Sequence, residues 1–457
     1  MAERQQAQEQ DKVKRRSNFE AVESNLTPEQ VKQEASRCLN CKNPKCIAGC
    51  PVNINIPAFI TALKEDNLEK AGEIIRETNM LPSVCGRVCP QERQCEGNCV
   101  LGIKGNAVAI GALERYAGDN TDVKIPKIKP SGRKAAVVGS GCAGIAAAAD
   151  LRKAGHEVVV FEALHELGGV LRYGIPPFRL PRTFLDKEIS NLKNMGVKFE
   201  TNVIVGKSVT LKQLKEDGFD AVFICSGAGL PKMLGIAGEN LNGVFSANEF
   251  LTRVNLMKAG RDKDCPTPLR TGRKAAVFGG GNVAMDAART AVRIGFEEVY
   301  IIYRRTGHEL PARLEEIRHA KEEGVIFKFL YAPKKIPGEN GYVKSVELEV
   351  MELGEPDGSG RQRPVGTGKT EIMDVDTVIV ALGTGPNPLI QKSAQAEGLE
   401  IITDKHGYIT IDAEKCSTSL DTVYAGGDVA PAGESNAISA MGAGKKAAKA
   451  INELLSK

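Results

Sequence analysis

Two stretches of the chain repeat one pattern: a short apolar run, a glycine-rich turn, an alanine-rich segment and a second apolar run. They are GRKAAVVGSGCAGIAAAADLRKAGHEVVVFE (132–162) and GRKAAVFGGGNVAMDAARTAVRIGFEEVYIIYRR (272–305). Such apolar runs predict buried strands, and the alanine-rich segments predict helices. Each stretch is expected to form a strand–helix–strand unit of a parallel sheet. The offset of 140 residues, Gly139 to Gly279, is too long for a solenoid repeat and predicts two copies of one domain type.

Two further segments, DAVFICSGA (220–228) and DTVIVALGTGPNP (376–388), are similar to each other. Each is a predicted strand followed by glycine, at a point where the chain is expected to cross between domains. They are expected to mark where the chain leaves the first of these domains and later re-enters it. Alternating apolar and polar residues in 342–366 predict an antiparallel excursion inside the second domain. We therefore predict an α/β protein with two nested Rossmann-like domains after a helical N-terminal domain. The predicted boundaries are 1–125 for the helical domain, 132–244 and 386–457 for the two segments of the first nucleotide domain, and 245–385 for the second, with a linker around KIPKIKPSGRKAA.

The first glycine turn reads Gly139-x-Gly141-x-x-Gly144. These glycines permit a tight turn, close approach of a pyrophosphate and close packing of helix on strand. Glu162 follows at the end of the next strand, where an acid can bind a ribose hydroxyl. The segment HELGGVLRYGIP extends this surface with Gly169 and Arg172. A glycine turn without a ligand is the alternative, but the acid at the right offset favours a dinucleotide site.

The second turn contains Gly279, Gly281, Asn282 and Ala284 at matching positions. Tyr303 replaces the acid, and Arg304 and Arg305 follow it. Arginines at the ribose end suit a 2′-phosphate, which a carboxylate would repel. This site is therefore expected to prefer NADP(H) over NAD(H), unless the two arginines are only a solvated strand end.

Charge and composition exclude several classes of protein. The net charge is 61 − 57 = +4 over 457 residues, with no long basic run, so no nucleic-acid partner is expected. The polar N-terminus is not a secretory signal, and no apolar run is long enough to cross a membrane. We expect a cytoplasmic enzyme, in which disulfides are rare and clustered cysteines are metal ligands or redox groups.

Eight of the twelve cysteines lie in residues 1–125, in two rows. The rows are Cys38-x2-Cys41-x4-Cys46-x3-Cys50-Pro51 and Cys85-x3-Cys89-Pro90-x4-Cys95-x3-Cys99. A structural zinc site would usually show two CxxC pairs, and only one is present. The gap of three residues before Cys50-Pro51 is similar to the bacterial ferredoxin pattern, although the preceding gap is longer. Iron–sulfur clusters, zinc and disulfides are all considered, and the dinucleotide sites favour iron–sulfur, because clusters can carry electrons from a redox dinucleotide and zinc has no redox role.

Near the C-terminus, TSLDTVYAGGDVAP places Gly427 and Asp428 after a predicted strand. This resembles the second FAD motif of the pyridine-nucleotide-disulfide reductase class. The resemblance implies FAD on the first Rossmann copy, with Asp428 binding its ribityl or phosphate part, and NADPH on the second copy. No redox CxxC occurs in 132–457, where the cysteines are isolated. The electrons must therefore leave by another route than a redox disulfide.

The segments RCLNCKNPKCIAGCPVNINIPAFI, LPSVCGRVCPQERQCEGNC and AIGALERYAGD resemble the small (beta) chain family of NADPH-dependent glutamate synthase. Relatives of this arrangement are the large subunit of the NADH-dependent ferredoxin–NADP oxidoreductase and the N-terminal half of dihydropyrimidine dehydrogenase. The resemblance implies two [4Fe–4S] clusters with crossed ligands. It implies Cys38, Cys41, Cys46 and Cys99 for one cluster, and Cys50, Cys89, Cys95 and Glu114 for the other. Cys85 is then spare.

The resemblance implies an FAD and iron–sulfur oxidoreductase that takes a hydride from NADPH and passes electrons through the clusters to a glutamate synthase large chain. No acid–base pair is required, so no catalytic residue is named, and His308 and Glu309 in YRRTGHELPARLEEIRHAKEEGV are given no catalytic role. One alternative is the large subunit of an electron-bifurcating NADH-dependent ferredoxin–NADP oxidoreductase, partnered by a ferredoxin–NADP reductase-like small subunit. The other is a zinc-stapled nucleotide-binding module without turnover. In either enzyme an oligomer is expected.

Overall fold

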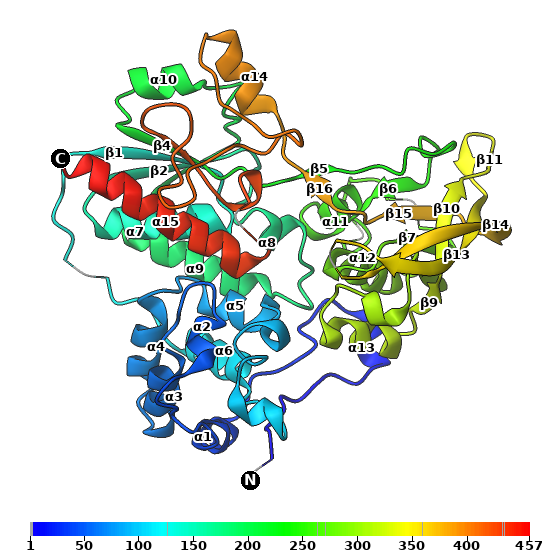
Figure 1. Cartoon of the computed structure of the whole chain (residues 1–457), viewed down its shortest axis with the longest axis horizontal. Coiled ribbons are helices and arrows are strands. Elements are labelled where there is room, and N and C mark those ends of the chain that lie inside the picture. The colour runs from blue at the N-terminus through cyan, green and yellow to red at the C-terminus, as the bar shows by residue number, and fades with distance from the viewer. Residues whose placement is uncertain are drawn as a thin grey trace.

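The chain folds into three domains in the computed structural model, which describes residues 3–125, 127–262, 264–269, 271–358, 360–431, 433 and 435–457. A helical N-terminal domain adjoins two α/β domains, each built on a five-stranded parallel sheet (Figure 1). This confirms the fold class that the two repeated apolar patterns predict. The predicted linker includes residue 126, which lies outside the described residues.

The N-terminal domain packs short helices around an apolar core that includes the fully buried Phe59, Ile75 and Leu113. Helix α1 (Pro28–Ser36) begins at a capping box, because Thr27 and Gln30 each accept a hydrogen bond from the other's backbone N–H. The domain's other helices, with 3₁₀ helices labelled η, are α2 (Lys45–Ala48), α3 (Ile56–Lys64), α4 (Leu68–Arg76), α5 (Pro82–Val88), η2 (Gln91–Arg93), η3 (Val100–Ile103) and α6 (Ile110–Asn120).

The first nucleotide domain is assembled from two separate stretches of chain. Its sheet has, in spatial order, β17 (Val423–Ala425), β4 (Ala221–Ile224), β1 (Lys134–Val138), β2 (Glu157–Glu162) and β3 (Lys198–Thr201). Its helices are α7 (Cys142–Lys153), α8 (Val170–Tyr173), α9 (Arg182–Asn194), α10 (Leu211–Glu216), α14 (Leu389–Ala396) and α15 (Ala437–Leu455). Figure 1 shows α7, α9 and α15 between this sheet and the N-terminal domain. Strand β1 is buried beyond its first residue, as expected for a parallel strand covered on both faces.

Helix α15 packs against α7 of its own domain and also against the cysteine-rich domain. A Cβ on Gly444 would lie 2.1 Å from the carbonyl oxygen of Ala143 on α7, so only glycine allows this close approach of the two helices. Gly442, on the same helix, faces Val52, which follows the first cysteine row. Among the described helices, α15 included, none is long and apolar enough to cross a membrane.

The second nucleotide domain repeats the same architecture. Its sheet has, in spatial order, β6 (Val244–Ser246), β15 (Thr377–Val380), β7 (Lys274–Phe278), β8 (Glu298–Tyr303) and β9 (Ile326–Phe329). Its helices are α11 (Ala247–Asn255), α12 (Asn282–Arg293), η4 (Gly307–Glu309) and α13 (Leu314–Glu322).

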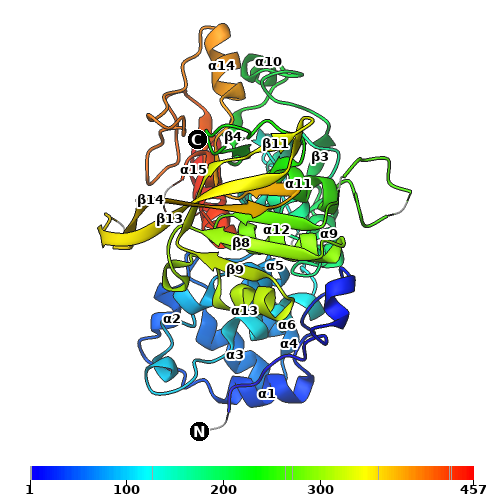
Figure 2. The same ribbon diagram turned by 90° about the vertical axis from the view of Figure 1, so that its right-hand side faces the viewer.

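A long antiparallel hairpin projects from this second domain (Figures 1 and 2). It is formed by β13 (Ser345–Pro356) and β14 (Gln362–Asp374), and β10 (Tyr331–Lys335) pairs with β13 on the other side. A smaller hairpin, β11 (Gly338–Glu339) with β12 (Tyr342–Val343), precedes it. The antiparallel excursion predicted for residues 342–366 is thus confirmed.

The chain crosses twice between the two nucleotide domains, as the paired strand-and-glycine segments predict. The outgoing strand β5 (Leu230–Pro231) pairs antiparallel with the returning strand β16 (Thr384–Gly385). The boundary expected at residues 244–245 falls inside β6, which already belongs to the second sheet.

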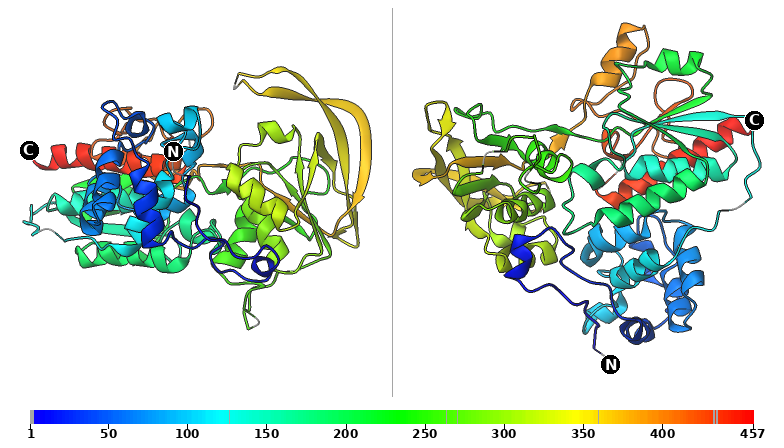
Figure 3. Two further views of the ribbon diagram at one scale, coloured as in Figure 1. Left: turned by 90° about the horizontal axis from the view of Figure 1, so that it is seen from below. Right: turned by 180° about the vertical axis from the view of Figure 1, so that it is seen from behind.

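The first residues of the chain reach across to the second nucleotide domain (Figure 3). We call residues 3–27 the N-terminal strap. It carries η1 (Lys14–Ser17), which packs against α12. The Arg15 side chain is 1% exposed and pairs with Glu322 at 2.7 Å and with Glu323 at 3.0 Å. The strap therefore joins the N-terminal domain to the second nucleotide domain through buried charges.

Candidate functional site

The first glycine turn connects β1 to α7 and leaves an open approach to the start of that helix. Gly139 has φ +114°, and a Cβ there would lie 2.6 Å from the carbonyl oxygen of Cys225. A Cβ on Gly144 would lie 2.0 Å from the Gly139 oxygen, whereas one on Gly141 would meet no atom within 4 Å. The unpaired N–H groups of the first turn of α7 thus have room for a phosphate, which a helix N-terminus attracts.

Glu162 is buried behind this turn and organises it. Its carboxylate accepts hydrogen bonds from Ser140 N at 3.0 Å, from Ser140 Oγ at 2.5 Å and from Leu164 N at 2.9 Å. Ser140 Oγ in turn accepts one from Gly168 N at 2.9 Å. A carboxylate offers about four acceptor positions, so one remains for a ribose hydroxyl. Ser140 stands at an unspecified position of the glycine motif, and no sequence signal marks it.

The sequence predicts FAD at this turn, and replacing Ser140 by alanine is then expected to weaken its binding roughly tenfold, because Glu162 and the Gly168 N–H would lose a buried partner at about 1–3 kcal/mol. FAD content after dialysis at graded free FAD concentrations measures the change. Ser208, whose hydroxyl bonds Ile204 in an exposed turn of the same domain, gives a matched alanine control that should retain FAD. Unchanged FAD retention in the Ser140 variant would contradict this role.

Asp428 lies beside the same turn, whereas the Arg172 side chain is already bonded to other groups of the protein. Asp428 follows Gly427 in η5 (Gly427–Val429), and a Cβ on Gly427 would lie 3.1 Å from that of Ala143 on α7. Burial raises the pKa of the Asp428 carboxyl. The Arg172 guanidinium donates to the Leu167 carbonyl at 2.9 Å and pairs with Asp186. Of the two, Asp428 is the better placed for a ligand on α7.

The second glycine turn has the same geometry as the first. A Cβ on Gly279 would lie 2.4 Å from the Ala381 oxygen, and one on Gly281 would meet no atom within 4 Å. Ala284 is fully buried in the first turn of α12. The Asn282 side chain does not face empty space, because its Oδ1 accepts a hydrogen bond from Arg313 N at 2.9 Å.

The two consecutive arginines that the sequence predicts for a 2′-phosphate have different surroundings in the structure. Arg305 is buried, donates to the Gln362 carbonyl at 2.7 Å and pairs with Asp357 at 2.6 Å, which ties it to the β13–β14 hairpin. Arg304 is exposed, and within the described part of the chain it has no ion-pair partner. Only Arg304 is therefore free to bind a phosphate.

Four thiols of the N-terminal domain line one cavity of about 30 Å³. They are Cys38, Cys41, Cys46 and Cys99, the set that the family resemblance implies for one cluster. Apolar side chains complete the wall, among them Ile56, Ile60 and Ile110. Burial raises the pKa of the Cys46 thiol to about 11, so without a metal ion it stays protonated at neutral pH. A bound cation would offset this cost by favouring the thiolate.

The second set gathers deeper, against α6. The thiol of Cys95 lies in electrostatic range of Cys50, Cys89 and the carboxyl of Glu114. Glu114 is 5% exposed, accepts a hydrogen bond from Asn79 Nδ2 at 2.6 Å, and burial raises its pKa to about 8. Buried carboxyl groups are rare unless they are paired or bind a metal, so this position fits a cluster ligand.

Both cysteine sets offer the thiolate ligands that iron–sulfur clusters take. In the described residues, no three cysteines have sulfur atoms that all lie within 4.8 Å of one another. All twelve cysteines are free thiols, so no disulfide competes for them.

Cys142 connects the second cysteine set to the first nucleotide site. The sequence separates it from every other cysteine, but the fold places it at the start of α7, in electrostatic range of both Cys89 and Asp428. It is fully buried, and burial raises its pKa to about 12. Cys142 thus belongs to the same buried core as Cys50, Cys89 and Cys95.

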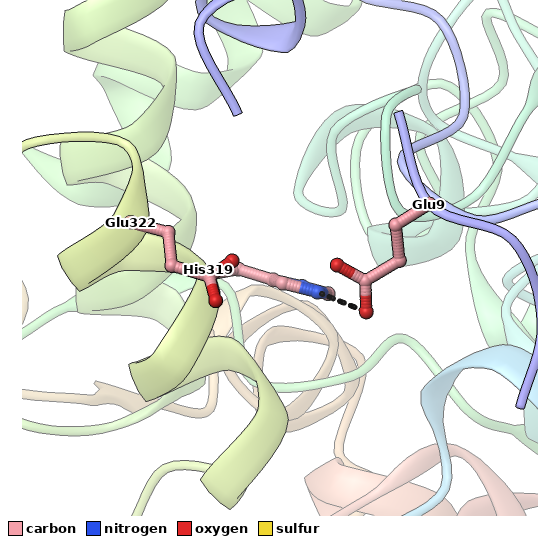
Figure 4. A group of neighbouring side chains, drawn as sticks. All are labelled: Glu9, His319 and Glu322. Atoms are coloured by element: carbon pink, nitrogen blue, oxygen red, sulfur yellow. Dashed lines mark ion pairs between the residues drawn. The ribbon is translucent and has the colours of Figure 1, made fainter. Parts of the chain in front are cut away.

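A different group of possible metal ligands lies at the N-terminal strap. Figure 4 shows Glu9 facing His319 and Glu322 of α13, with ligand atoms within 4.8 Å of one another. Arg15 pairs with both carboxylates, and so does Arg318. These guanidinium groups would repel a cation, so the group belongs to the ionic contact that holds the strap.

Models of two protein families match this chain. Residues 15–125 match dihydropyrimidine dehydrogenase domain II with its 4Fe-4S cluster, and residues 133–452 match the pyridine nucleotide-disulphide oxidoreductases.

Among individual proteins, the chain is similar to the glutamate synthase [NADPH] small chain of Escherichia coli K12, at 36% identity over 96% of this chain and 94% of that one. It is similar to the NADP(+)-dependent formate dehydrogenase subunit beta of Moorella thermoacetica, at 38% identity over 90% of this chain, which spans only 60% of that protein. In fold, it resembles Mycobacterium tuberculosis FprA in complex with NADPH, with a TM-score of 0.59 and 22% identity over 72% of this chain and 85% of that one.

Proposed function

Because the chain belongs to the family of the NADPH-dependent glutamate synthase small chain, we propose that it is an electron-input subunit, which oxidises NADPH and supplies electrons to a glutamate synthase large chain. Its nucleotide domains are of the pyridine nucleotide-disulphide oxidoreductase type. In this proposal FAD binds at the first glycine turn with Glu162 and Asp428, NADPH at the second with Arg304, and [4Fe–4S] clusters at the two cysteine sets. When bound, the flavin supplies hydride acceptance and the clusters supply one-electron transfer.

The placement of Cys142 carries this proposal. It is buried at the start of α7, in the same core as Cys89 of the second cysteine set and in electrostatic range of Asp428 beside the first glycine turn. The two proposed cofactor sites are therefore neighbours, and the protein's task is to hold them at fixed positions. The first cysteine set, which contains four thiols of intermediate exposure, lies nearer the surface and suits the exit side.

The names of the relatives support a partner subunit. They include the glutamate synthase [NADPH] small chain and the NADP(+)-dependent formate dehydrogenase subunit beta, and both names imply a further chain. Mixing this chain with a glutamate synthase large chain should produce glutamate from glutamine and 2-oxoglutarate at the expense of NADPH. Reduction of ferredoxin, with no glutamate formed, would favour the electron-bifurcating alternative instead.

Substituting Arg304 and Arg305 one at a time tests the nucleotide preference. Replacing Arg304 by glutamine is expected to lower kcat/KM for NADPH roughly tenfold to hundredfold and to leave NADH unchanged. The reason is that a hydrogen bond between charged groups contributes about 1.5–3 kcal/mol. Steady-state oxidation of each nucleotide, with an artificial acceptor that takes electrons directly from the flavin, measures both kcat/KM values.

Arg305→Gln is the matched control. Because Arg305 pairs with Asp357, this variant should leave the ratio of the NADPH to the NADH kcat/KM at its wild-type value. A loss of preference in the Arg305 variant alone would contradict the proposed assignment.

A further inference from the structure

The segment ELPARLEEIR, which follows the predicted phosphate-binding arginines, contains a buried residue with no role in the scheme above. Arg313 directly precedes α13 and is 7% exposed. Its main chain contacts the second nucleotide domain, whereas its side chain reaches the cysteine-rich domain and also pairs with Glu315 of α13. It therefore offers a direct contact between the second nucleotide site and the cysteine-rich domain that does not pass through the first nucleotide domain.

On the nucleotide side, the backbone around Arg313 is hydrogen-bonded to the second glycine turn and to the start of α12. Ala312 N donates a hydrogen bond to the Gly280 carbonyl at 3.2 Å, and Arg313 N donates to Asn282 Oδ1 at 2.9 Å. A Cβ on Gly280 would lie 2.7 Å from Leu310, so the same segment packs directly on the turn. Residues 310–313 are therefore held directly against the second glycine turn.

On the cysteine side, the Arg313 guanidinium holds the segment that contains Cys89. It donates to the Arg87 carbonyl at 2.7 Å and to Gln91 Oε1 at 2.8 Å, both within two residues of Cys89. Next to it, Leu314 N donates to Glu92 Oε1 at 3.3 Å. The guanidinium has a planar, fixed set of donors, so it holds both acceptors in one geometry.

Gln91 extends this contact to the rest of the second cysteine set. Its amide donates to the carbonyls of Cys85, at 3.4 Å, and Gly86, at 3.2 Å. A Cβ on Gly111 of α6 would lie 2.5 Å from Gln91 Nε2, so α6, the helix of Glu114, packs tightly against it. Arg313 thus contacts a closely packed unit formed by α5, η2 and α6.

We propose that Arg313 is a positioning residue that couples nucleotide binding at the second glycine turn to the segment holding the second cysteine set. This inference rests on the proposed function, because it assumes that the second turn binds NADP(H). The coupling keeps the nucleotide domain in register with the cysteine-rich domain. It is reciprocal, so a more rigid cysteine segment also strengthens nucleotide binding.

Hydrogen exchange of the full-length holoprotein with and without NADP⁺ tests the coupling. In the wild type, NADP⁺ is expected to slow exchange about fivefold or more both at residues 279–285 and at residues 82–92. In Arg313→Gln, slowing should remain at 279–285 and be lost at 82–92, and the affinity for NADP⁺ should fall roughly fivefold. Arg313→Lys, which keeps the charge without the fixed set of donors, should restore part of the affinity.

Two other variants separate coupling from general stability. Arg318→Gln, on the same helix with a side chain 44% exposed, should retain slowed exchange at both segments. Gln91→Leu removes the acceptor on the opposite side, together with the amide donor to Cys85 and Gly86, and should reproduce the Arg313→Gln pattern. If Arg313→Gln does not yield holoprotein, Gln91→Leu decides the question, with Arg318→Gln as its control.

The outcomes distinguish this inference from the function on which it rests. Slowed exchange at 279–285 without any change at 82–92 in the wild type would overturn the coupling and leave the NADPH site standing. Slowed exchange at 82–92 that survives in both Arg313→Gln and Gln91→Leu would also overturn it. If NADP⁺ protects neither segment of the wild type, the proposed nucleotide site fails, and the inference fails with it.

Discussion

Replacing Cys99 by serine is expected to stop electron delivery to a partner subunit while NADPH oxidation at the flavin continues. Cys99 lines the cavity of the first cysteine set together with Cys38, Cys41 and Cys46. Serine offers a hydroxyl in place of the thiolate that iron prefers. Because even outer-shell substitutions cost about 10- to 100-fold in metal affinity, loss of a ligand should empty this site. Iron content should fall from about eight to about four per chain.

Two activities on the same preparation measure this effect. Partner-dependent glutamate formation should fall roughly a hundredfold or more, and NADPH oxidation with a flavin-level acceptor should change by less than about threefold. Cys85→Ala is the matched control, since Cys85 is a buried thiol of the same domain outside both proposed ligand sets. Full iron content in the Cys99 variant, or loss of iron in the Cys85 variant, would contradict the assignment.

The second large effect is expected from Arg179→Ala at the contact between the two nucleotide domains. Arg179 precedes α9 of the first domain and pairs with Asp286 at 2.6 Å and Glu316 at 2.9 Å in the second. All three side chains are about 5% exposed or less. Removing one partner of a buried ion pair leaves an uncompensated charge and costs about 3–5 kcal/mol. The midpoint of urea unfolding, followed by circular dichroism, should fall accordingly.

The stability lost in Arg179→Ala should depend on pH. Burial raises the pKa of Asp286 to about 6, above the value of about 3.9 expected for the unfolded chain. A raised pKa contributes stability at low pH that is lost as pH rises through about 6, and without Arg179 the carboxyl binds its proton more tightly still. The variant should therefore lose less stability at pH 5.5 than at pH 8.

Arg253→Ala serves as the control for Arg179→Ala. Arg253 pairs with Glu249 on the surface of α11, and such an exposed pair contributes less than about 1 kcal/mol. Its unfolding midpoint should move little at either pH. A loss in Arg179→Ala no larger than in this control would show that the contact between the domains does not depend on these charges.

The parts of the fold that depend on local pattern could be predicted from the sequence. The two strand–turn–helix–strand units and the paired crossings follow from apolar runs and from glycines whose positions are fixed by close contacts, such as that between Gly144 and Gly139. The grouping of the cysteines did not follow from spacing. Cys50 and Cys99 each belong with residues of the other row, and only the family resemblance implied this exchange.

Contacts between residues far apart in the chain could not be predicted. Arg305 looks like a phosphate ligand in the sequence, but it pairs with Asp357, 52 residues later, on a hairpin that no motif places beside it. Arg313 reaches Gln91 across 222 residues. Cys142 reads as an isolated cysteine until the fold brings α7 against the second cysteine set. Each of these contacts depends on how distant segments of the chain pack together, which local patterns do not encode.

In the proposed function, one chain holds a nicotinamide nucleotide, a flavin and iron–sulfur clusters in series. The most direct test is the iron, sulfide and flavin content of anaerobically purified protein, together with its visible spectrum before and after NADPH. We expect about eight irons and one FAD per chain, with a spectrum bleached by NADPH and much less by NADH. Zinc in place of iron would contradict the account, because the thiols would then stabilise the fold and the electrons would have no exit.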